Sequence, residues 1–280
     1  MNKILSKDNS KTIVIEPRRG WHMLDWNELK EYRDLFYFLV WRQIKVLYAQ
    51  TILGFSWAIL QPLVQIIIFT VVFGKVAKIP TDGIPYFLFA TISVLPWTYI
   101  SQSMSQASQS LVSGQSLLSK VYFPRIIFPI TPVLARLVDF GISMFILLPV
   151  ILYYRIPLTW NLLYLPIFLL MMVAIPFGVG AWLSAVAIRF RDVQHALPFV
   201  VRMLIYSAPI VYSSSSIPEN YRFLYSLNPI VGVIEGFRAC FLGRTIPWEY
   251  IVPGLFTSVI LVVGGLIYFK KMERVFVDVI

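Results

Sequence analysis

Charged residues inside apolar stretches are the first candidates for chemistry in this sequence. Arg136 and Asp139 stand three positions apart within the apolar run 126–153. A helix would place both on one face, where they can form an ion pair. Ionisable residues at such a depth are functional candidates by default, and the alternative is a structural pair whose members satisfy each other. The sequence leaves both alternatives open.

The segment 117–129, LLSKVYFPRIIFP, is a second candidate because it lies between two long apolar runs. Two cations flank two aromatics in it, and Pro124 stops the helix that precedes it. This combination predicts a short protruding segment that docks into a groove of a soluble partner. The alternative is an ordinary interfacial turn, because cations and aromatics gather at headgroup level in many membrane proteins. The docking candidates are Leu117, Leu118, Lys120, Val121, Tyr122, Phe123, Pro124 and Arg125.

Several groupings that would carry catalysis are missing. There is no G-x-x-x-x-G-K-S/T phosphate loop, so we do not expect the chain to bind ATP by itself in the usual way. His22 and His195 lack metal-ligand spacing, and no metal site is expected. The apolar runs also contain no cluster of carboxylates for a proton relay or for acid–base work.

The amino-acid composition indicates whether these elements lie in water or in a lipid bilayer. Of 280 residues, 58% are hydrophobic and 14% are charged, whereas soluble domains are about 45–50% apolar and about 25% charged. A water-soluble core is therefore excluded, and we expect a multi-spanning membrane protein. Basic loops on the cytoplasmic side explain the net charge of +10 better than nucleic-acid binding does. The single cysteine, Cys240, excludes an internal disulfide.

The apolar runs predict an all-α membrane protein with six transmembrane helices and both termini in the cytoplasm. A polar arm over 1–24 and an amphipathic helix over 25–48 precede the membrane domain, which covers 55–270 and leads into a basic tail over 271–280. Lysine and arginine are concentrated in the segments that this arrangement places inside, as the positive-inside rule requires. The predicted spans are 55–74, 86–106, 126–153, 162–188, 197–212 and 254–269.

The amphipathic helix over 25–48 is predicted to lie in the membrane interface. Asp25 is a good N-cap, Glu28 stands at the capping-box spacing, and apolar residues then recur with the period of a helix. The rest of its surface carries too many charges to cross a bilayer, so the helix should lie in the plane of the interface. Its candidate contact residues are Trp26, Arg33, Arg42 and Lys45.

Other segments predict how the helices pack. The segment 228–243 is too short to span a bilayer and carries Glu235 and Arg238, which predicts a pair of short re-entrant or interfacial helices on the external side. Gln61 and Gln65 share a face of the first span, either as interhelical hydrogen bonds or as the wall of a polar pathway. The fourth span has a small-residue face for close packing, made by Gly178, Gly180, Ala181, Ser184 and Ala185.

The ordered set of motifs resembles one family. A charged amphipathic helix is followed by LGFSWAILQP, LLSKVYFPR, RFRDVQHALPF and NPIVGVIEGFR, and the likeness covers nearly the whole chain from about residue 21 onward. This order is similar to the membrane subunit of ABC-2 type exporters of polysaccharides and polyol phosphates. That family moves lipid-linked O-antigen, capsular polysaccharide and teichoic acid.

The resemblance implies a permease in the bacterial cytoplasmic (inner) membrane that is not itself an enzyme. It implies a homodimer with two separate ABC nucleotide-binding subunits, which would hold ATP and magnesium, while this chain holds no cofactor. By the same resemblance, 25–48 is the interface helix, 117–125 is the cytoplasmic coupling helix, and Glu235 and Arg238 belong to a gate at the external mouth. The implied candidates for the glycan path are Trp97, Tyr99, Tyr206 and Tyr212.

Three functions stay open at this point. The first is export of a lipid-linked polysaccharide, most simply an O-antigen or a similar cell-surface glycan. The second, also by an ABC-2 exporter, is export of teichoic acid, drugs or small lipids. The third is a membrane-embedded enzyme acting on lipid-linked sugars, which would have to use the scattered carboxylates Asp139, Asp192 and Glu235. The expected partners also include membrane lipids, and nucleic acid is not among them.

Overall fold

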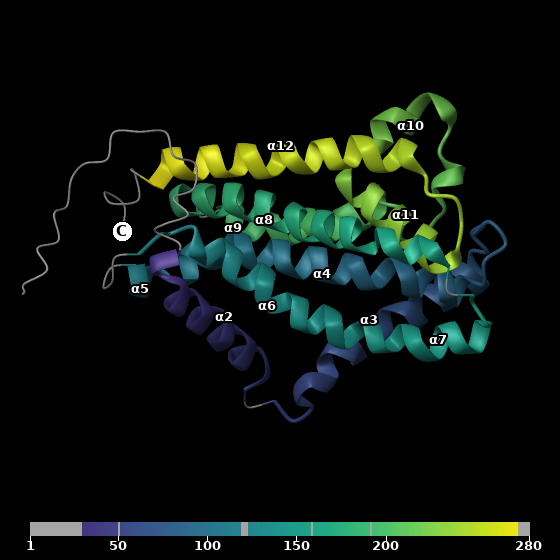
Figure 1. Cartoon of the computed structure of the whole chain (residues 1–280), viewed down its shortest axis with the longest axis horizontal. Helices are drawn as coiled ribbons and strands as arrows, with labels where there is room; N and C mark the ends of the chain where they lie inside the picture. Colours follow the sequence, from purple (N-terminus) through teal and green to yellow (C-terminus); the bar gives the residue numbers. More distant parts are fainter. Residues whose placement is uncertain (1–29, 50, 119–122, 158, 191, 274–280) are drawn as a thin grey trace, which may run out of the picture.

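The computed structural model describes residues 30–49, 51–118, 123–157, 159–190 and 192–273. All regular elements in these ranges are helical, which confirms the predicted all-α class for the described residues. Most of the helices run along the long axis of an elongated bundle (Figure 1). The α-helices are α2 (Arg33–Tyr48), α3 (Trp57–Phe69), α4 (Tyr86–Ser113), α5 (Gln115–Leu118), α6 (Ile127–Ser143), α7 (Leu147–Tyr154), α8 (Leu165–Arg189), α9 (Asp192–Leu204), α10 (Glu219–Ser226), α11 (Pro229–Leu242) and α12 (Trp248–Glu273).

Short stretches of tighter or wider helix extend several of these elements. A 3-10 turn, Gly54–Ser56, precedes α3, and a π-helix, Thr70–Val76, continues it. The 3-10 turn Met144–Ile146 joins α6 to α7, so that the two run as one helix. Three more 3-10 turns lie at Trp160–Tyr164, Ile205–Ser207 and Ser214–Ser216.

Four helical stretches of the described chain are long and apolar enough to cross a membrane. They are Gly54–Val76, Ile127–Tyr154, Trp160–Arg189 and Trp248–Glu273, and each coincides with a predicted span. The other two predicted spans correspond to α4 and α9. With 28 residues, α4 is about 42 Å long at about 1.5 Å per residue, but its second half is polar. The count of six spans therefore stays a prediction.

The predicted fifth span, 197–212, does not form one continuous helix. α9 ends at Leu204, a short 3-10 turn follows, and the chain is extended at Ala208, with φ −124° and ψ 156°. The reason is local, because Pro209 disfavours the helical conformation in the residue before it. A helix of 13 residues is about 20 Å long, which is less than the hydrocarbon thickness of about 30 Å.

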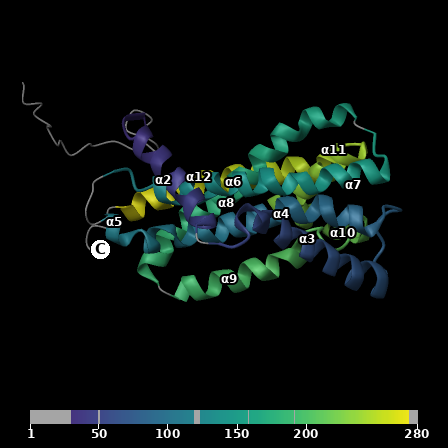
Figure 2. The ribbon, with the colours of Figure 1, turned by 90° about the horizontal axis from the view of Figure 1, so that it is seen from below.

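α4 and α8 form the centre of the bundle. α8 packs against α4, α11 and α12, and α4 also packs against α3 and α6. Figure 2 shows α9 along one edge, and this helix contacts α4 and α8. The small-residue face of α8 allows the close approach: a Cβ on Gly178 would lie 2.7 Å from the backbone of α12, and one on Gly180 would lie 2.4 Å from the Cβ of Ala107 on α4. At these two positions the predicted close packing is confirmed.

α2 slants away from the bundle and contacts it through α6 (Figure 1). Leu39 is its buried residue, while it exposes both the charged Arg42 and the aromatic Phe38 and Trp41. A surface that mixes cations with exposed aromatics suits a helix lying at a membrane interface. The predicted first turn, with Asp25, Trp26 and Glu28, lies outside the described residues.

The segment 228–243 holds one helix, where the sequence predicted a pair of short helices. Asn228 caps α11 by accepting a hydrogen bond from the backbone N–H of Ile230 at 3.1 Å, and Pro229 occupies the first turn. Nothing interrupts the helix until Gly243, whose positive φ of 64° ends it. α10, which comes before Asn228, is the second short helix at this end of the bundle. α11 is buried along most of its length.

Candidate functional site

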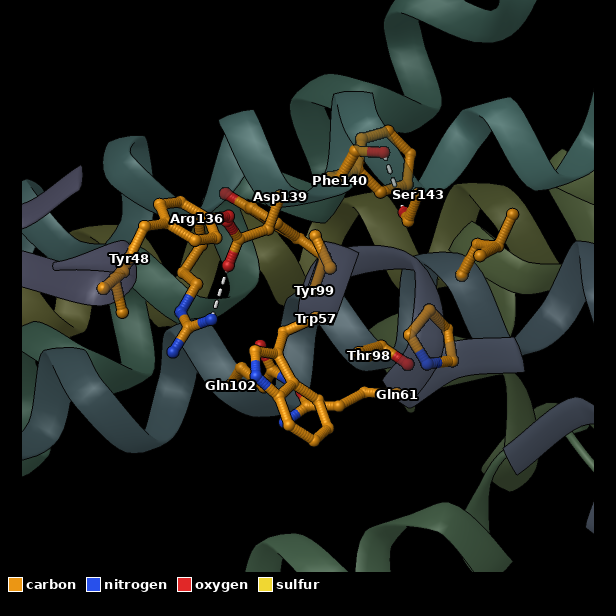
Figure 3. A pocket seen from close by; sticks show the side chains of 14 residues that line it. Tyr48, Trp57, Gln61, Thr98, Tyr99, Gln102, Arg136, Asp139, Phe140 and Ser143 are labelled. Atoms are coloured by element: carbon orange, nitrogen blue, oxygen red, sulfur yellow. Dashed lines mark hydrogen bonds and ion pairs between the residues drawn. The ribbon is translucent and has the colours of Figure 1, made fainter. Parts of the chain in front are cut away.

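A cavity of about 450 Å³ lies where the end of α2, the start of α3 and the middle parts of α4 and α6 meet (Figure 3). Its wall combines a charged pair with amides, hydroxyls and aromatic rings. Figure 3 shows these side chains converging from all four helices. The polar and aromatic residues that line it are Tyr48, Trp57, Gln61, Thr98, Tyr99, Gln102, Arg136, Asp139, Phe140 and Ser143.

The ion pair predicted between Arg136 and Asp139 forms in this wall. The guanidinium Nη1 of Arg136 lies 2.5 Å from Oδ2 of Asp139, and the two side chains are 15% and 14% exposed. The Tyr48 hydroxyl donates a hydrogen bond to the other oxygen of Asp139, and Arg136 Nε donates to the side-chain oxygen of Gln106 at 3.1 Å. These contacts join α2, α6 and α4 in one network, which we call the α2–α6–α4 network.

Two members of this network, Tyr48 and Gln106, were not predicted as site residues. Tyr48 stands at the end of the predicted interface helix and was not among its candidate contact residues. Gln106 lies in the polar half of α4, and the unusual polarity of this stretch was the only sequence feature that pointed to a role for it. Tyr48 also packs against Phe55, with ring centroids 4.0 Å apart, so it bridges α2 to the entry of α3.

The two helices on the other side of the cavity are joined through amides. Gln102 Nε2 donates to Gln61 Oε1 at 3.1 Å, which links α4 to α3. This bond supports the interpretation of Gln61 as an interhelical hydrogen-bonding group. Tyr99 turns its hydroxyl to the carbonyl of Val133 at 2.9 Å, so it ties α4 to α6 while it lines the cavity.

The four aromatic residues predicted for a glycan path occupy different surroundings. Trp97 and Tyr99 are buried on α4, with exposed fractions of 4% and 3%. Tyr99 lines the cavity described above, whereas Trp97 belongs to the apolar core. Tyr206 is exposed after α9, and the hydroxyl of Tyr212 donates to its carbonyl at 3.0 Å. A shared path for the four residues stays a prediction.

The predicted docking segment is described only at its two ends. Lys120, Val121 and Tyr122 lie outside the described residues. Phe123 is buried and packs against Phe128, with ring centroids 5.4 Å apart. Arg125 Nη1 donates to the backbone carbonyl of Glu273 at 3.0 Å, which holds the segment against the end of α12. The remaining docking candidates are Leu117 and Leu118 in α5, and Pro124, which is half-buried.

The charged candidates of the predicted interface helix point to its exposed side. Arg33 pairs with the neighbouring Asp34 at 3.3 Å, and both side chains are exposed. Arg42 is exposed, and Nζ of Lys45 lies 5.4 Å from the ring centroid of Trp41. These contacts leave the cationic face of α2 available to a partner outside the bundle.

Glu235 and Arg238, two residues predicted for an external gate, form a largely buried ion pair at 2.7 Å on α11, which was not predicted. Arg238 also donates to the hydroxyl of Ser93 on α4 at 2.7 and 3.1 Å and to the carbonyl of Pro209. Its guanidinium carbon lies 3.6 Å from the ring centroid of Phe89. The pair therefore fastens α11 to α4 and to the chain that follows α9.

The three carboxylates considered for an enzyme belong to separate surroundings. Asp139 and Glu235 are each paired with an arginine, in different networks, and Asp192 is exposed at the start of α9. Among the described residues, no three acidic, histidine or cysteine side chains gather in a way that could hold a metal ion. The structure therefore brings together no joint acid–base centre from these candidates.

Comparison with known proteins decides the family. Residues 34–242 match the family described as ABC-2 type transporter. The chain belongs to the ABC-2 type transporter family. The match includes every residue of the α2–α6–α4 network and of the buried pair on α11. The resemblance drawn from the ordered motifs is thereby confirmed.

Curated relatives of this ABC-2 transporter match along nearly the whole chain. It is 26% identical to the O-antigen export system permease protein RfbA of Klebsiella pneumoniae over 255 residues, which are 88% of this chain and 95% of that protein. It is 28% identical to the protein of the same name from Myxococcus xanthus over 222 residues, with 79% and 85% covered. It is 25% identical to the polysialic acid transport protein KpsM of Escherichia coli over 250 residues, with 83% and 91% covered.

Proposed function

We propose that this chain is the permease subunit of an ATP-driven exporter that moves a lipid-linked polysaccharide across the bacterial cytoplasmic membrane. The observation that carries the proposal is the family match together with near full-length relatives named for O-antigen export. An O-antigen is the first candidate substrate. A capsular polysaccharide is the second, because two further relatives are named for polysialic acid transport.

The proposed assembly is a homodimer with two nucleotide-binding subunits, which bind ATP and magnesium and carry out the hydrolysis. Each permease chain crosses the membrane six times, with both termini inside. In this arrangement the two spans beyond the four apolar ones are α4 and the stretch made of α9 together with the chain that follows it to residue 212. The polar half of α4 then continues to the cytoplasmic end of the bundle, where Figure 1 shows α5 and the end of α12.

The α2–α6–α4 network suggests how a push from the ATPase subunits reaches the membrane helices. α2 exposes its charges and contacts the bundle through α6. Because Tyr48 is hydrogen-bonded to Asp139, and Asp139 is paired with Arg136, a tilt of α2 pulls on α6 and, through Gln106, on α4. A movement of this kind changes the cavity between these helices.

Deletion and complementation test the exporter. Loss of the chain is expected to remove the surface polysaccharide, and wild type restores it. The docking segment is tested by co-expressing the permease with its candidate ATPase subunit, as wild type or as the variant Lys120→Glu/Tyr122→Ala/Arg125→Glu. The ATPase is expected to co-purify with wild type alone.

A single Arg125→Ala variant serves as the control, because Arg125 also bonds to the carbonyl of Glu273 within the chain. Normal surface polysaccharide in the deletion strain would contradict the exporter. Normal assembly and coupled ATPase activity in the triple variant would contradict the docking role of the segment.

A further inference from the structure

A second cavity, of about 390 Å³, lies at the end of the bundle that we propose to be external. It is enclosed by the loop before α4, the turn at 213–215, α10, the second half of α11 and the start of α12. Its volume falls in the range of about 300–1,000 Å³ that small-molecule sites occupy. None of its lining residues borders the first cavity.

The charges of its described lining residues cancel. Three are acidic, Asp82, Glu235 and Glu249, and three are arginines, at positions 222, 238 and 244. A lining without net charge does not favour an isolated anion or cation. Carboxylates accept hydrogen bonds and guanidinium groups donate them, and a neutral ligand with many hydroxyl groups can satisfy both kinds of partner at once.

Hydroxyls and aromatic rings complete the wall. Serines 213–215 and Thr245 supply groups that both donate and accept hydrogen bonds. Phe89 and Tyr250 also border the cavity, but both are buried, and the Arg238 guanidinium covers the face of the Phe89 ring. The carboxylates, guanidinium groups and hydroxyls around this one space are therefore suited to the hydroxyl groups of a sugar.

Part of this wall is already fixed by bonds within the chain. Arg238 is 4% exposed and is held by Glu235, Ser93 and the carbonyl of Pro209. The carboxylate of Asp82 accepts hydrogen bonds from the hydroxyls of two serines, at positions 213 and 215. A frame held in this way reduces the conformational entropy that a ligand must remove on binding.

Other lining groups keep hydrogen-bonding capacity for a ligand. Glu249 is exposed at the start of α12 and makes no hydrogen bond or ion pair with any described residue. Arg244 uses one of its five N–H donors, at Nη2, on the carbonyl of Asp82 at 2.9 Å. The wall therefore offers the carboxylate of Glu249 as an acceptor and the remaining N–H groups of Arg244 as donors.

We propose that this cavity binds one neutral sugar residue of the exported polysaccharide on the external side of the membrane. Glu249 accepts hydrogen bonds from the sugar hydroxyls, and Arg244 donates to their oxygens. The proposal rests on the proposed function for its substrate class, and the location of the site rests on the cavity alone. A site of this kind holds a sugar unit of the polysaccharide as the polysaccharide leaves the membrane. Binding there disfavours movement of the polysaccharide back into the membrane.

Saturation-transfer NMR on the full-length chain in lipid nanodiscs tests the site, because both membrane faces are then accessible. The probes are methyl α-D-mannopyranoside and methyl β-D-galactopyranoside. Saturation of the protein is expected to transfer to the ring protons of at least one probe. Thr245→Trp fills the exposed rim of the cavity and should weaken binding at least tenfold. Glu249→Gln keeps the shape of the side chain and should weaken binding about threefold or more, because it removes a charged acceptor.

Asn220→Trp is the matched control, because Asn220 is exposed on α10 and does not line the cavity. It is expected to bind the probes as wild type does. Absence of transfer to both probes, or equal binding by the two tryptophan variants, would overturn the sugar site. Surface polysaccharide is scored separately in the deletion strain. ATP-driven export without probe binding overturns only the site, whereas probe binding with normal polysaccharide in the deletion strain overturns only the exporter.

Discussion

Two arginine–carboxylate pairs with i, i+3 spacing each recruit a partner from another helix. Arg136 and Asp139 on α6 bind Gln106 on α4 and Tyr48 on α2. In the second pair, Arg238 on α11 reaches Ser93 on α4. In each case the pair neutralises its own charge, and its remaining hydrogen-bonding groups fasten a second element. A buried pair of this kind fixes position more than it adds stability.

Tyr48→Phe should uncouple α2 from α6 without unfolding the chain. The substitution removes only the hydroxyl that donates to Asp139, while the Arg136–Asp139 pair remains. A hydrogen bond to a charged group contributes about 1.5–3 kcal/mol. We therefore expect ATP-driven export to fall about tenfold at unchanged expression, measured as surface polysaccharide in a complemented deletion strain.

Tyr37→Phe provides the control for this variant. Tyr37 lies on the same helix and is 71% exposed, so the loss of its hydroxyl should leave export unchanged. If Tyr48→Phe exports as well as Tyr37→Phe, the bond to Asp139 does not transmit motion, and the α2–α6–α4 network is only a structural brace.

Asp82 makes the order of the 213–217 turn depend on pH. Burial raises its pKa, but the hydrogen bonds from the Ser213 and Ser215 hydroxyls and the charge of Arg244 lower it, and the net pKa lies below the ordinary value. Because the folded pKa is depressed, the stabilisation is present above the unfolded pKa of about 3.9 and is lost as pH falls through the folded pKa. Hydrogen exchange in the 213–217 peptide, corrected for its intrinsic pH dependence, should accelerate below about pH 4.

The same measurement on Asp82→Asn isolates the carboxylate. The amide keeps nearly the same shape but carries no charge, so the turn should exchange faster at neutral pH and show no further acceleration in acid. Acid acceleration of the same size in Asp82→Asn would assign the effect to another group.

At the scale of elements, the contact between α8 and α12 depends on glycine. A Cβ on Gly265 of α12 would lie 2.4 Å from the carbonyl oxygen of Gly178 on α8. The two backbones touch there, so neither helix has a flexible side chain that could move aside. Helices in lipid gain their association energy from close packing of this kind, because lipid tails are as apolar as the side chains.

Gly265→Val should therefore separate the two helices. Overpacking usually costs about 1–3 kcal/mol, and a contact between rigid backbones lies at the upper end or beyond. We expect a lower melting temperature in detergent and a lower yield of folded protein. Gly264→Val is the control, since a Cβ at Gly264 meets nothing within 4 Å. Equal melting temperatures for the two valine variants would contradict the tight contact.

At the scale of the whole molecule, the two ends of the bundle should face opposite sides of the membrane. α10 lies at one end, and α5 with the end of α12 lies at the other (Figure 1). The last turn of α12 and the next residue carry a basic cluster, Lys270, Lys271 and Arg274, which the positive-inside rule assigns to the cytoplasm. We therefore expect the opposite end, with α10, to face the external side.

Cysteine labelling in spheroplasts tests this orientation. Asn220→Cys on α10 should react with a membrane-impermeant maleimide added outside, whereas Gln115→Cys on α5 should react only after permeabilisation; both positions are exposed. The native Cys240 is 1% exposed and provides an unlabelled background. The opposite labelling pattern would reverse the topology and remove the external assignment of both α10 and the second cavity.

The sequence by itself determined four of the membrane helices and one charge pair along a helix. Four predicted spans coincide with continuous apolar helices, and the predicted Arg136–Asp139 pair forms. These features are local, because an apolar run and two charges at i, i+3 spacing each lie within a single helix. Local signals that were misread gave the errors: Pro209 interrupts the predicted fifth span, and α11 continues unbroken to Gly243.

Only the tertiary structure decided which helices the polar side chains join. Tyr48 meets Asp139 across 91 positions, and Arg238 meets Ser93 across 145. No periodicity in the sequence encodes such partners, because the rotation and the neighbours of each helix are set when all the helices pack together. For the same reason, the two cavities became visible only in the folded chain.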